Sequence, residues 1–352
     1  MLSCEARVRN NSPFIWNIDV LEQMKLDLTN NKEAIAIITV ADRYCEKTPV
    51  VVVDKGECVF EPNVHYYCSV GQYWWPDTLN IGTYIRRDGI SNPESKKYDR
   101  VRLTELAKRC EKLSQAFYLT RNRKYFDALM IQLKAWFINK DTYMLPNFEY
   151  SQIIPGQNDN KGRGAGIIDA YDFNTVIESI RLVNGVKRIN RRTMRGLQAW
   201  FLEFAVWTED GPFCDYIRNK DNNIGLAADV TLVNMYLFAG EEIRAKEIVD
   251  SFAERRIYKQ ITEDGLQPAE LERTNAFSYS LSNVTHLIDF CFLVRYWDTA
   301  YYLRNHDRID AAFNFLGQFV EDESSFPYKQ IGEWDLSKEN YYKQITRLEL
   351  LK

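Results

Sequence analysis

Apolar residues recur at helical spacing along most of this 352-residue chain. Over residues 101–137 they follow each other at intervals of three and four, as in a pair of amphipathic helices. The same spacing predicts two helices within residues 17–46, broken near Asn30 and Asn31. Further helices are predicted at about residues 170–184, 190–208, 226–239, 242–256, 275–297 and 299–320. A strand signal is confined to residues 50–53, so we expect a mainly α fold.

Long loops separate these helices and hold most of the Gly, Pro and Asn of the chain. They span residues 55–100, 140–168, 209–224 and 259–274. Antiparallel helix pairs joined by alternating short and long loops suggest an α/α arrangement, in which the long loops meet at one end and form a cleft. No low-complexity linker divides the sequence, so we predict a single domain over residues 1–352.

The composition of the chain limits its possible partners. The net charge of −4 gives no general attraction for nucleic acid or another polyanion, so an acidic ligand would need a local basic cleft. No apolar run approaches the roughly 18 residues that span a bilayer, and we expect no transmembrane segment. Aromatic residues reach 14%, which is high, and Tyr and Trp stack against sugar rings as well as fill cores.

The cysteines and histidines form no metal or redox motif. The seven cysteines contain no CxxC pair, and the three histidines form no tight cluster with them. We therefore expect no catalytic metal, and we interpret the cysteines as buried small hydrophobic residues. The first residues lead straight into charged sequence, so we expect no signal peptide in this chain. Cys4 could be the remnant of a lipoprotein attachment site, or its position could be accidental.

Arg273 and Tyr279 lie six residues apart at the start of a predicted helix. Six residues make about 1.7 helical turns, so the two side chains converge only if Arg273 lies in the loop that enters the helix. An arginine can hold a carboxylate, and a tyrosine can transfer a proton. A uronic-acid lyase needs both functions.

The first long loop contains consecutive aromatic residues, Tyr73, Trp74 and Trp75. Neighbouring side chains point in different directions, so at least one ring is available to a ligand. The alternative is that the loop packs as a plug over a helical core. Arg86 and Arg87 follow, and they could neutralise carboxylates or simply remain solvated.

Two further loops carry polar residues suited to a sugar acid. In the second loop these are Asn147, Tyr150, Gln152 and Arg163. Its glycines follow no strand and precede no Lys-Ser/Thr pair, so we expect no nucleotide site. Asn222 and Asn223 enter a predicted helix, and one of them could serve as its cap. Their carboxamides could also neutralise a substrate carboxyl group, which makes the adjacent C–H more acidic.

With these motifs the chain resembles the alginate lyase superfamily of polysaccharide lyases, whose fold is an incomplete α/α toroid. The resemblance covers about residues 30–330. Its five markers, in the expected order, are residues 67–69 with 73–77, 86–89, 147–152, 222–225, and 267–273 with Tyr279. It implies β-elimination in chains of mannuronate, guluronate or glucuronate, an anionic polysaccharide substrate, no cofactor, and export to the periplasm or secretion.

The resemblance also implies a role for each residue. Asn223 would neutralise the carboxylate with help from Arg273, and Tyr279 would protonate the leaving glycosidic oxygen. The expected substrate-binding residues are Asn222, Tyr67, Tyr73, Trp74, Trp75, Arg86, Arg87, Asn147, Tyr150, Gln152 and Arg163. Family members commonly have His directly after the second Asn, whereas this chain has Ile224.

Three explanations for Ile224 stay open. Tyr279 could both remove and return the proton, which requires both departing groups on one side of the ring, as in mannuronate or glucuronate, and requires Arg273 to favour the phenolate. His65 could act as the base, whereas His286 is expected to be a core residue. Finally, the protein could bind uronate chains without cutting them.

We therefore predict an all-α toroid that acts as a uronic-acid polysaccharide lyase. The first alternative is a non-catalytic protein that binds such polysaccharides. The second is a toroid-fold glycoside hydrolase that uses two carboxylates, with Asp77 and Glu270 as examples.

Overall fold

The computed structural model describes residues 11–55, 60 and 62–352. Two compact units are distinguished: unit 1 comprises Met1–Gly71, Pro93–Cys214 and Asn234–Glu242, and unit 2 comprises Gln72–Asn92, Asp215–Val233 and Ile243–Lys352. The single domain expected from the sequence stays a prediction. Cys4 lies outside the described residues. Within them, no helix combines the length and the apolar character needed to cross a bilayer.

Unit 1 is built from helices, as the apolar spacing predicts. They are α2 (Ile18–Leu26), α3 (Lys32–Cys45), α4 (Asp99–Thr120), α5 (Arg123–Phe137), α6 (Asp172–Val186) and α7 (Arg191–Asp210). The expected break near Asn31 is confirmed, because its side chain accepts a hydrogen bond from Ala34 N and caps α3. Asn17, Asn122 and Asn190 cap three other helices in the same way.

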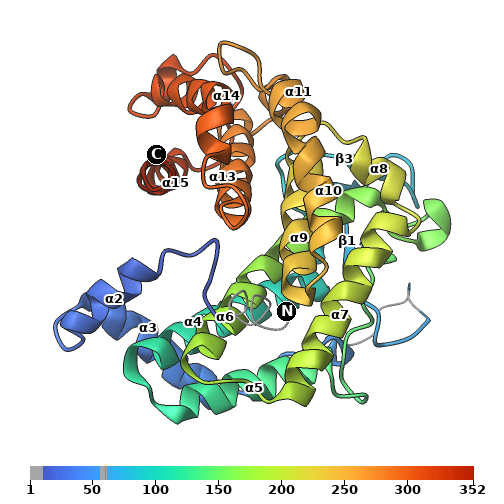
Figure 1. Cartoon of the computed structure of the whole chain (residues 1–352). Helices are drawn as coiled ribbons and strands as arrows, with labels where there is room; N and C mark the ends of the chain where they lie inside the picture. The colour runs from blue at the N-terminus through green and yellow to red at the C-terminus, as the bar shows by residue number, and fades with distance from the viewer. Residues whose placement is uncertain (1–10, 56–59, 61) are drawn as a thin grey trace. The chain divides into compact units, whose positions relative to one another are not determined.

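The long helix α4 is the centre of unit 1. It packs against α3, α5 and α6 (Figure 1), and its apolar residues, such as Leu103 and Leu106, are fully buried. An aromatic cluster fills the core, with ring centroids of neighbours at 4.7–6.1 Å. Its members are Phe137, Phe148, Phe173, Trp200, Phe201 and Phe204. These rings are therefore core residues and not part of a sugar-binding wall.

The predicted strand at residues 50–53 is wrong. Val52–Asp54 forms a 3-10 turn, and Val51 and Val52 are buried, so this apolar run fills the core without joining a ladder. Strands occur instead inside the long loops. In unit 1, β1 (Cys68–Val70) pairs in parallel with β4 (Tyr150–Ile153). Segments this short carry no clear alternation in the sequence.

Unit 2 contains a second group of helices. They are most of α10 (Glu242–Phe252), the π-helical turn η5 (Ala253–Ile257), α11 (Tyr258–Gln260), α12 (Pro268–Leu271), α13 (Ala276–Val294), α14 (Tyr301–Gly317) and α15 (Trp334–Glu349). The chain passes from unit 1 to unit 2 within α8 (Cys214–Arg218) and back within α9 (Asn223–Ala239). α13 packs against α12, and also against α14 and α15, which lie beside it in Figure 1. The sequence did not predict α15.

A two-stranded hairpin also belongs to unit 2. β2 (Trp74–Pro76) pairs antiparallel with β3 (Tyr84–Arg86), with Trp75 opposite Ile85. Asp77 closes the turn, because its carboxylate accepts hydrogen bonds from Leu79 N and from the Asn80 side chain. The hairpin fixes the positions of Tyr73 and Asp88, which lie at its two ends.

The start of α9 is held by a buried arginine. Arg256 donates to Asp229 (Nε to Oδ2, 2.7 Å) and to the carbonyl of Lys220 (2.6 Å). Gly225 lies against this pair, and a Cβ there would come within 2.1 Å of Lys220 O and 2.6 Å of Arg256 Nη1. Only glycine therefore fits at this position.

We expect Gly225→Ala to lower the free energy of unfolding by about 1–3 kcal/mol, because neither the Lys220 carbonyl nor the buried ion pair can give way. The matched control is Gly196→Ala in α7, whose Cβ would meet only the flexible end of Ile138 at 3.2 Å. The control should be neutral or about 1 kcal/mol more stable, because alanine favours the helix. Urea unfolding measures both, and equal stability of the two variants would contradict the packing described.

Candidate active site

Arg273 lies in the loop between α12 and α13, and Tyr279 lies in the first turn of α13. This is the arrangement that allows the two side chains to converge. The Arg273 guanidinium carbon is 3.9 Å from the centre of the Tyr279 ring, a cation–π contact. The predicted pairing of these two residues is therefore present in unit 2.

Asp88, at the end of the hairpin, holds Arg273. Its carboxylate accepts from Arg273 Nη2 at 2.8 Å and from Arg273 Nε at 3.1 Å, and both side chains are largely buried. Thr274 adds bonds from its backbone N–H and its hydroxyl. Burial opposes ionisation of Asp88, but these donors hold the pKa of its carboxyl well below the usual range. The guanidinium is thus fixed and its charge is balanced before any ligand arrives.

Gly89 makes this contact possible. Its φ of +75° favours glycine, and a Cβ would lie 2.5 Å from Thr274 Oγ1. The hairpin end can therefore approach the 273–274 backbone closely. Arg86 and Arg87 are the residues predicted to bind a ligand in this motif, whereas Asp88 is not. The Asp-Gly pair that ends the motif is the sequence signal that points to Asp88.

Tyr279 is tied to the other end of the hairpin. Its hydroxyl lies 2.5 Å from the hydroxyl of Tyr73, and either group can be the donor. Burial, and then the neighbouring Tyr73, raise the pKa of Tyr279 well above its usual value near 10, although Arg273 acts in the opposite direction. Arg273 thus favours the phenolate as expected, but burial and Tyr73 outweigh it, and Tyr279 stays protonated in the free protein.

The two asparagines at the start of α9 have different surroundings. Asn222 is the helix cap, because its side-chain oxygen accepts from Ile224 N at 3.1 Å. The backbone N–H of Asn223 donates to Glu270 Oε1 at 2.6 Å, and His286 hydrogen-bonds to the Asn223 backbone. The Asn223 carboxamide makes no hydrogen bond within the described residues. It is the group of this pair that is available to a ligand.

Two buried titratable groups support Asn223. Burial raises the pKa of Glu270 to about 7, although the hydrogen bond from the Asn223 N–H and the positive charges of Arg273 and Lys220 lower it. Burial lowers the pKa of His286 to about 4, so this residue is neutral, as expected for a core histidine. The sequence suggested Glu270 only as a hydrolase carboxylate, and its contact with Asn223 could not be foreseen from spacing.

The remaining predicted residues of unit 2 lie on the hairpin. Trp75 is partly exposed, donates to the carbonyl of Ile90, and carries Arg87 over its ring at 5.0 Å. Arg86 is half exposed and forms an ion pair with Asp88 at 2.6 Å. Trp74 is also partly exposed. Both rings keep part of their surface exposed, and their role in ligand binding stays a prediction.

Several predicted binding residues lie instead in a polar network inside unit 1. Asp169 accepts from Tyr67 OH at 2.9 Å, from Gln152 Nε2 at 3.1 Å, and from Ser69 and Arg100. Tyr67 is fully buried and stacks on Phe148. It has no ring face to offer a sugar in this structure, and Gln152 is likewise buried. The same residue types serve sugar binding and buried networks, which is why sequence reasoning did not separate them.

The other predicted residues of the second loop also have local partners. Tyr150 is buried in β4 with its ring edge against Tyr66. Arg163 donates to Gln152 Oε1 at 2.9 Å, and Asn147 accepts from Glu149 N at 3.2 Å. Both keep part of their surface exposed. Burial therefore leaves Tyr150 unsuited to the predicted stacking role.

His65 lies in a surface pocket of unit 1. Its Nδ1 is 2.7 Å from the carbonyl of Tyr143, and the two rings are 5.1 Å apart. The pocket has a volume of about 660 Å³ and also contains Lys140 and Glu203. These contacts lie within unit 1, and a role for His65 as the base stays a prediction.

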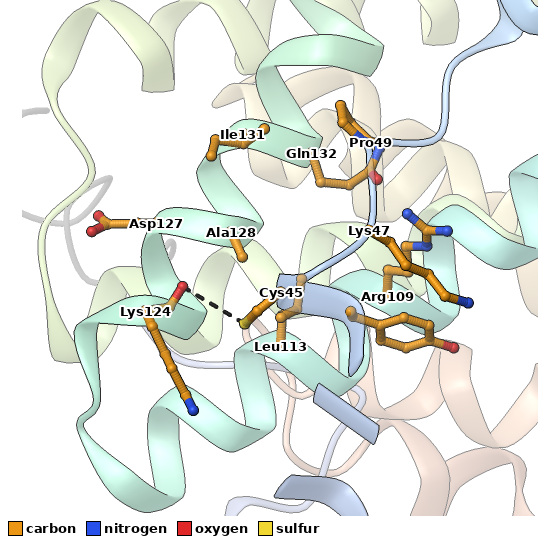
Figure 2. A pocket seen from close by; sticks show the side chains of 11 residues that line it. Cys45, Lys47, Pro49, Arg109, Leu113, Lys124, Asp127, Ala128, Ile131 and Gln132 are labelled. Carbon is orange, nitrogen blue, oxygen red and sulfur yellow. Dashed lines mark hydrogen bonds between the residues drawn. The ribbon is translucent and has the colours of Figure 1, made fainter. Parts of the chain in front are cut away.

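A second pocket of unit 1, of about 300 Å³, lies between the end of α3 and helices α4 and α5 (Figure 2). Lys47, Arg109 and Lys124 line it, and the Cys45 thiol points to the Lys124 carbonyl. None of the predicted site residues lines this pocket.

The cysteine and carboxylate expectations need two corrections. Cys110 and Cys291 are buried free thiols as expected, but Cys68 is disulfide-bonded. Asp77 is engaged in the hairpin turn, where hydrogen bonds from Asn80 and Leu79 lower the pKa of its carboxyl. It therefore serves the turn, and the hydrolase alternative stays a prediction.

The raised pKa of Glu270 predicts a pH effect on stability. Its folded value of about 7 exceeds the ordinary 4.5, so its stabilising effect is complete below pH 4.5 and is lost as the pH rises through 7. Glu270→Gln should therefore lose less stability than the wild type between pH 5 and pH 8, measured as the melting temperature. The exposed Glu272→Gln is the control and should follow the wild type. Parallel curves for all three proteins would contradict this assignment.

The chain is similar to known alginate lyases in sequence and in fold. The family model described as alginate lyase matches residues 59–326. Among solved structures, an alginate lyase from Bacteroides ovatus is 33% identical, with 96% of this chain and 91% of that chain covered and a TM-score of 0.88. No curated protein matches. The match confirms the expected all-α toroid class, and the chain belongs to the alginate lyase family.

Proposed function

We propose that this protein cleaves a uronic-acid polysaccharide of the mannuronan or glucuronan type by β-elimination. Family membership supports a polysaccharide lyase. The observation that carries the proposal is the cluster of unit 2, in which Arg273 contacts Tyr279 and Glu270 connects this segment to Asn223. A carboxylate-binding group and a proton donor are thereby supplied by one unit.

Asn223 is proposed to bind the substrate carboxylate through its carboxamide. The N-terminus of α9, where Asn223 lies, carries a partial positive charge that favours an anion. Arg273 uses Nε and Nη2 for Asp88, which leaves Nη1 without a partner in the described residues and available to the same carboxylate. Hydrogen bonds that strengthen as negative charge develops stabilise the carbanion-like transition state.

Tyr279 is proposed as the acid that protonates the leaving oxygen. Its raised pKa keeps it protonated at neutral pH, which suits an acid. To remove the substrate proton as well, it must first lose its own. The Tyr73 hydroxyl at 2.5 Å can accept that proton while passing its own to solvent. One tyrosine serving both steps requires both groups to leave from the same side of the ring, which favours mannuronan or glucuronan over guluronan.

Tyr279→Phe is expected to lower the rate of formation of unsaturated chain ends by at least about 100-fold, because the proton donor is lost. The double bond absorbs near the ultraviolet edge, which gives a direct assay on mannuronan, glucuronan and guluronan. Tyr216→Phe is the control, since Tyr216 is exposed in the same unit, and it should keep the wild-type rate. Full activity of Tyr279→Phe would overturn the assignment of the acid.

A second candidate function rests on Ile224, which cannot act as a base. The protein would then bind uronate chains without cutting them. Measurable binding of oligosaccharides by calorimetry, together with no unsaturated product from any of the three polymers, would favour this candidate. Release of saturated sugars would instead indicate a hydrolase.

Ile224→His tests whether a base at this position, which Ile224 cannot provide, would serve the reaction. Ile224 is partly exposed at the start of α9, next to the available Asn223 carboxamide. We expect the imidazole to act as a base, and to raise turnover about tenfold or more, most clearly on guluronan. Ile224→Gln, which is polar but not basic, is the control. If neither variant has a higher turnover than the wild type on any polymer, this position cannot supply a base.

The disulfide at Cys68 bears on localisation. Disulfides persist in oxidising compartments and are rare in the cytosol. We therefore propose that the protein works in the periplasm or outside the cell, in agreement with a polysaccharide substrate.

A further inference from the structure

Glu270 is a buried carboxyl that the proposed chemistry does not use. Its side chain is 1% exposed and lies in α12, three residues before Arg273. Oε1 accepts from Asn223 N at 2.6 Å, whereas Oε2 is buried and has no hydrogen-bond partner within the described residues. An ionised carboxylate with one oxygen unsatisfied is costly to bury. This placement therefore needs an explanation.

The charges that face Glu270 come from four segments. Lys220, from the loop before α9, and Arg273 favour its ionised form, and Asp88 of the hairpin opposes it. His286 of α13 is buried and neutral, and it hydrogen-bonds to the backbone of Asn223, the residue whose N–H donates to Glu270. Arg273 is already paired with Asp88, so its positive charge only partly balances the negative charge of an ionised Glu270.

A neutral Glu270 keeps the same hydrogen bond, because Oε1 still accepts from Asn223 N when the proton is on Oε2. What changes is the charge beside Asn223. An ionised Glu270 repels an anion that binds to the Asn223 carboxamide, and like charges this close in a buried site disfavour each other strongly. A neutral Glu270 removes this repulsion and still fixes the Asn223 backbone.

We propose that Glu270 is a positioning residue that takes up a proton from solvent when a uronate carboxylate binds at Asn223. The neutral carboxyl then holds Asn223 in place while the ligand supplies the negative charge. This inference rests on the proposed function, because it needs a uronate ligand at Asn223. It makes ligand affinity depend on pH through a group that does not touch the substrate.

The test uses the Tyr279→Phe protein, in which turnover does not interfere, and a mannuronan tetrasaccharide. Calorimetry between pH 5.5 and pH 8.5 should show affinity that weakens by up to about tenfold per pH unit above pH 7. Titrations in buffers of different ionisation enthalpy should show proton uptake on binding. Adding Glu270→Gln, which mimics the neutral carboxyl, should abolish both effects, whereas adding Glu272→Gln should leave them unchanged.

Three results would overturn the inference. Binding that is independent of pH and releases or takes up no proton in the Tyr279→Phe protein refutes it directly, even if the Glu270 variant does not fold. Persistence of the pH dependence after Glu270→Gln assigns it to another group. If no uronate binds at any pH, the proposed function fails as well, so the two failures are distinguishable.

Discussion

The ion pair between Asp88 and Arg273 is the interaction on which the candidate site depends. It joins the end of the hairpin to the loop before α13, with two hydrogen bonds from the guanidinium and two more from Thr274. The other end of the hairpin brings Tyr73 to Tyr279. One short hairpin thus orients both the cation and the phenol. A bidentate pair restrains the guanidinium plane, which a single contact would not do.

The charges in this region are balanced before a ligand is present. Asp88 neutralises Arg273, burial keeps Tyr279 protonated, and His286 is neutral. Glu270 is the group whose charge can change near neutral pH. In the proposed function, an entering uronate would meet the available Asn223 carboxamide and the Nη1 atom of Arg273.

Much of the fold follows from the sequence. The 3.6-residue spacing and the capping asparagines, such as Asn31, predict where helices run. The short strands could not be predicted, because three or four residues carry no reliable alternation. The convergence of Arg273 and Tyr279 was anticipated from helix geometry, but Asp88 was not, since its partner lies 185 residues away. Likewise, nothing in the composition of its loop distinguishes a buried Tyr67 from an exposed one.

A crystal structure of the Tyr279→Phe protein with a mannuronan tetrasaccharide would show whether Asn223 and Arg273 bind the uronate carboxylate. We expect one uronate carboxylate within hydrogen-bond distance of the Asn223 carboxamide and of Arg273 Nη1, with the glycosidic oxygen facing the ring at position 279. An oligosaccharide that makes no contact with Asn223 or Arg273 would contradict these roles.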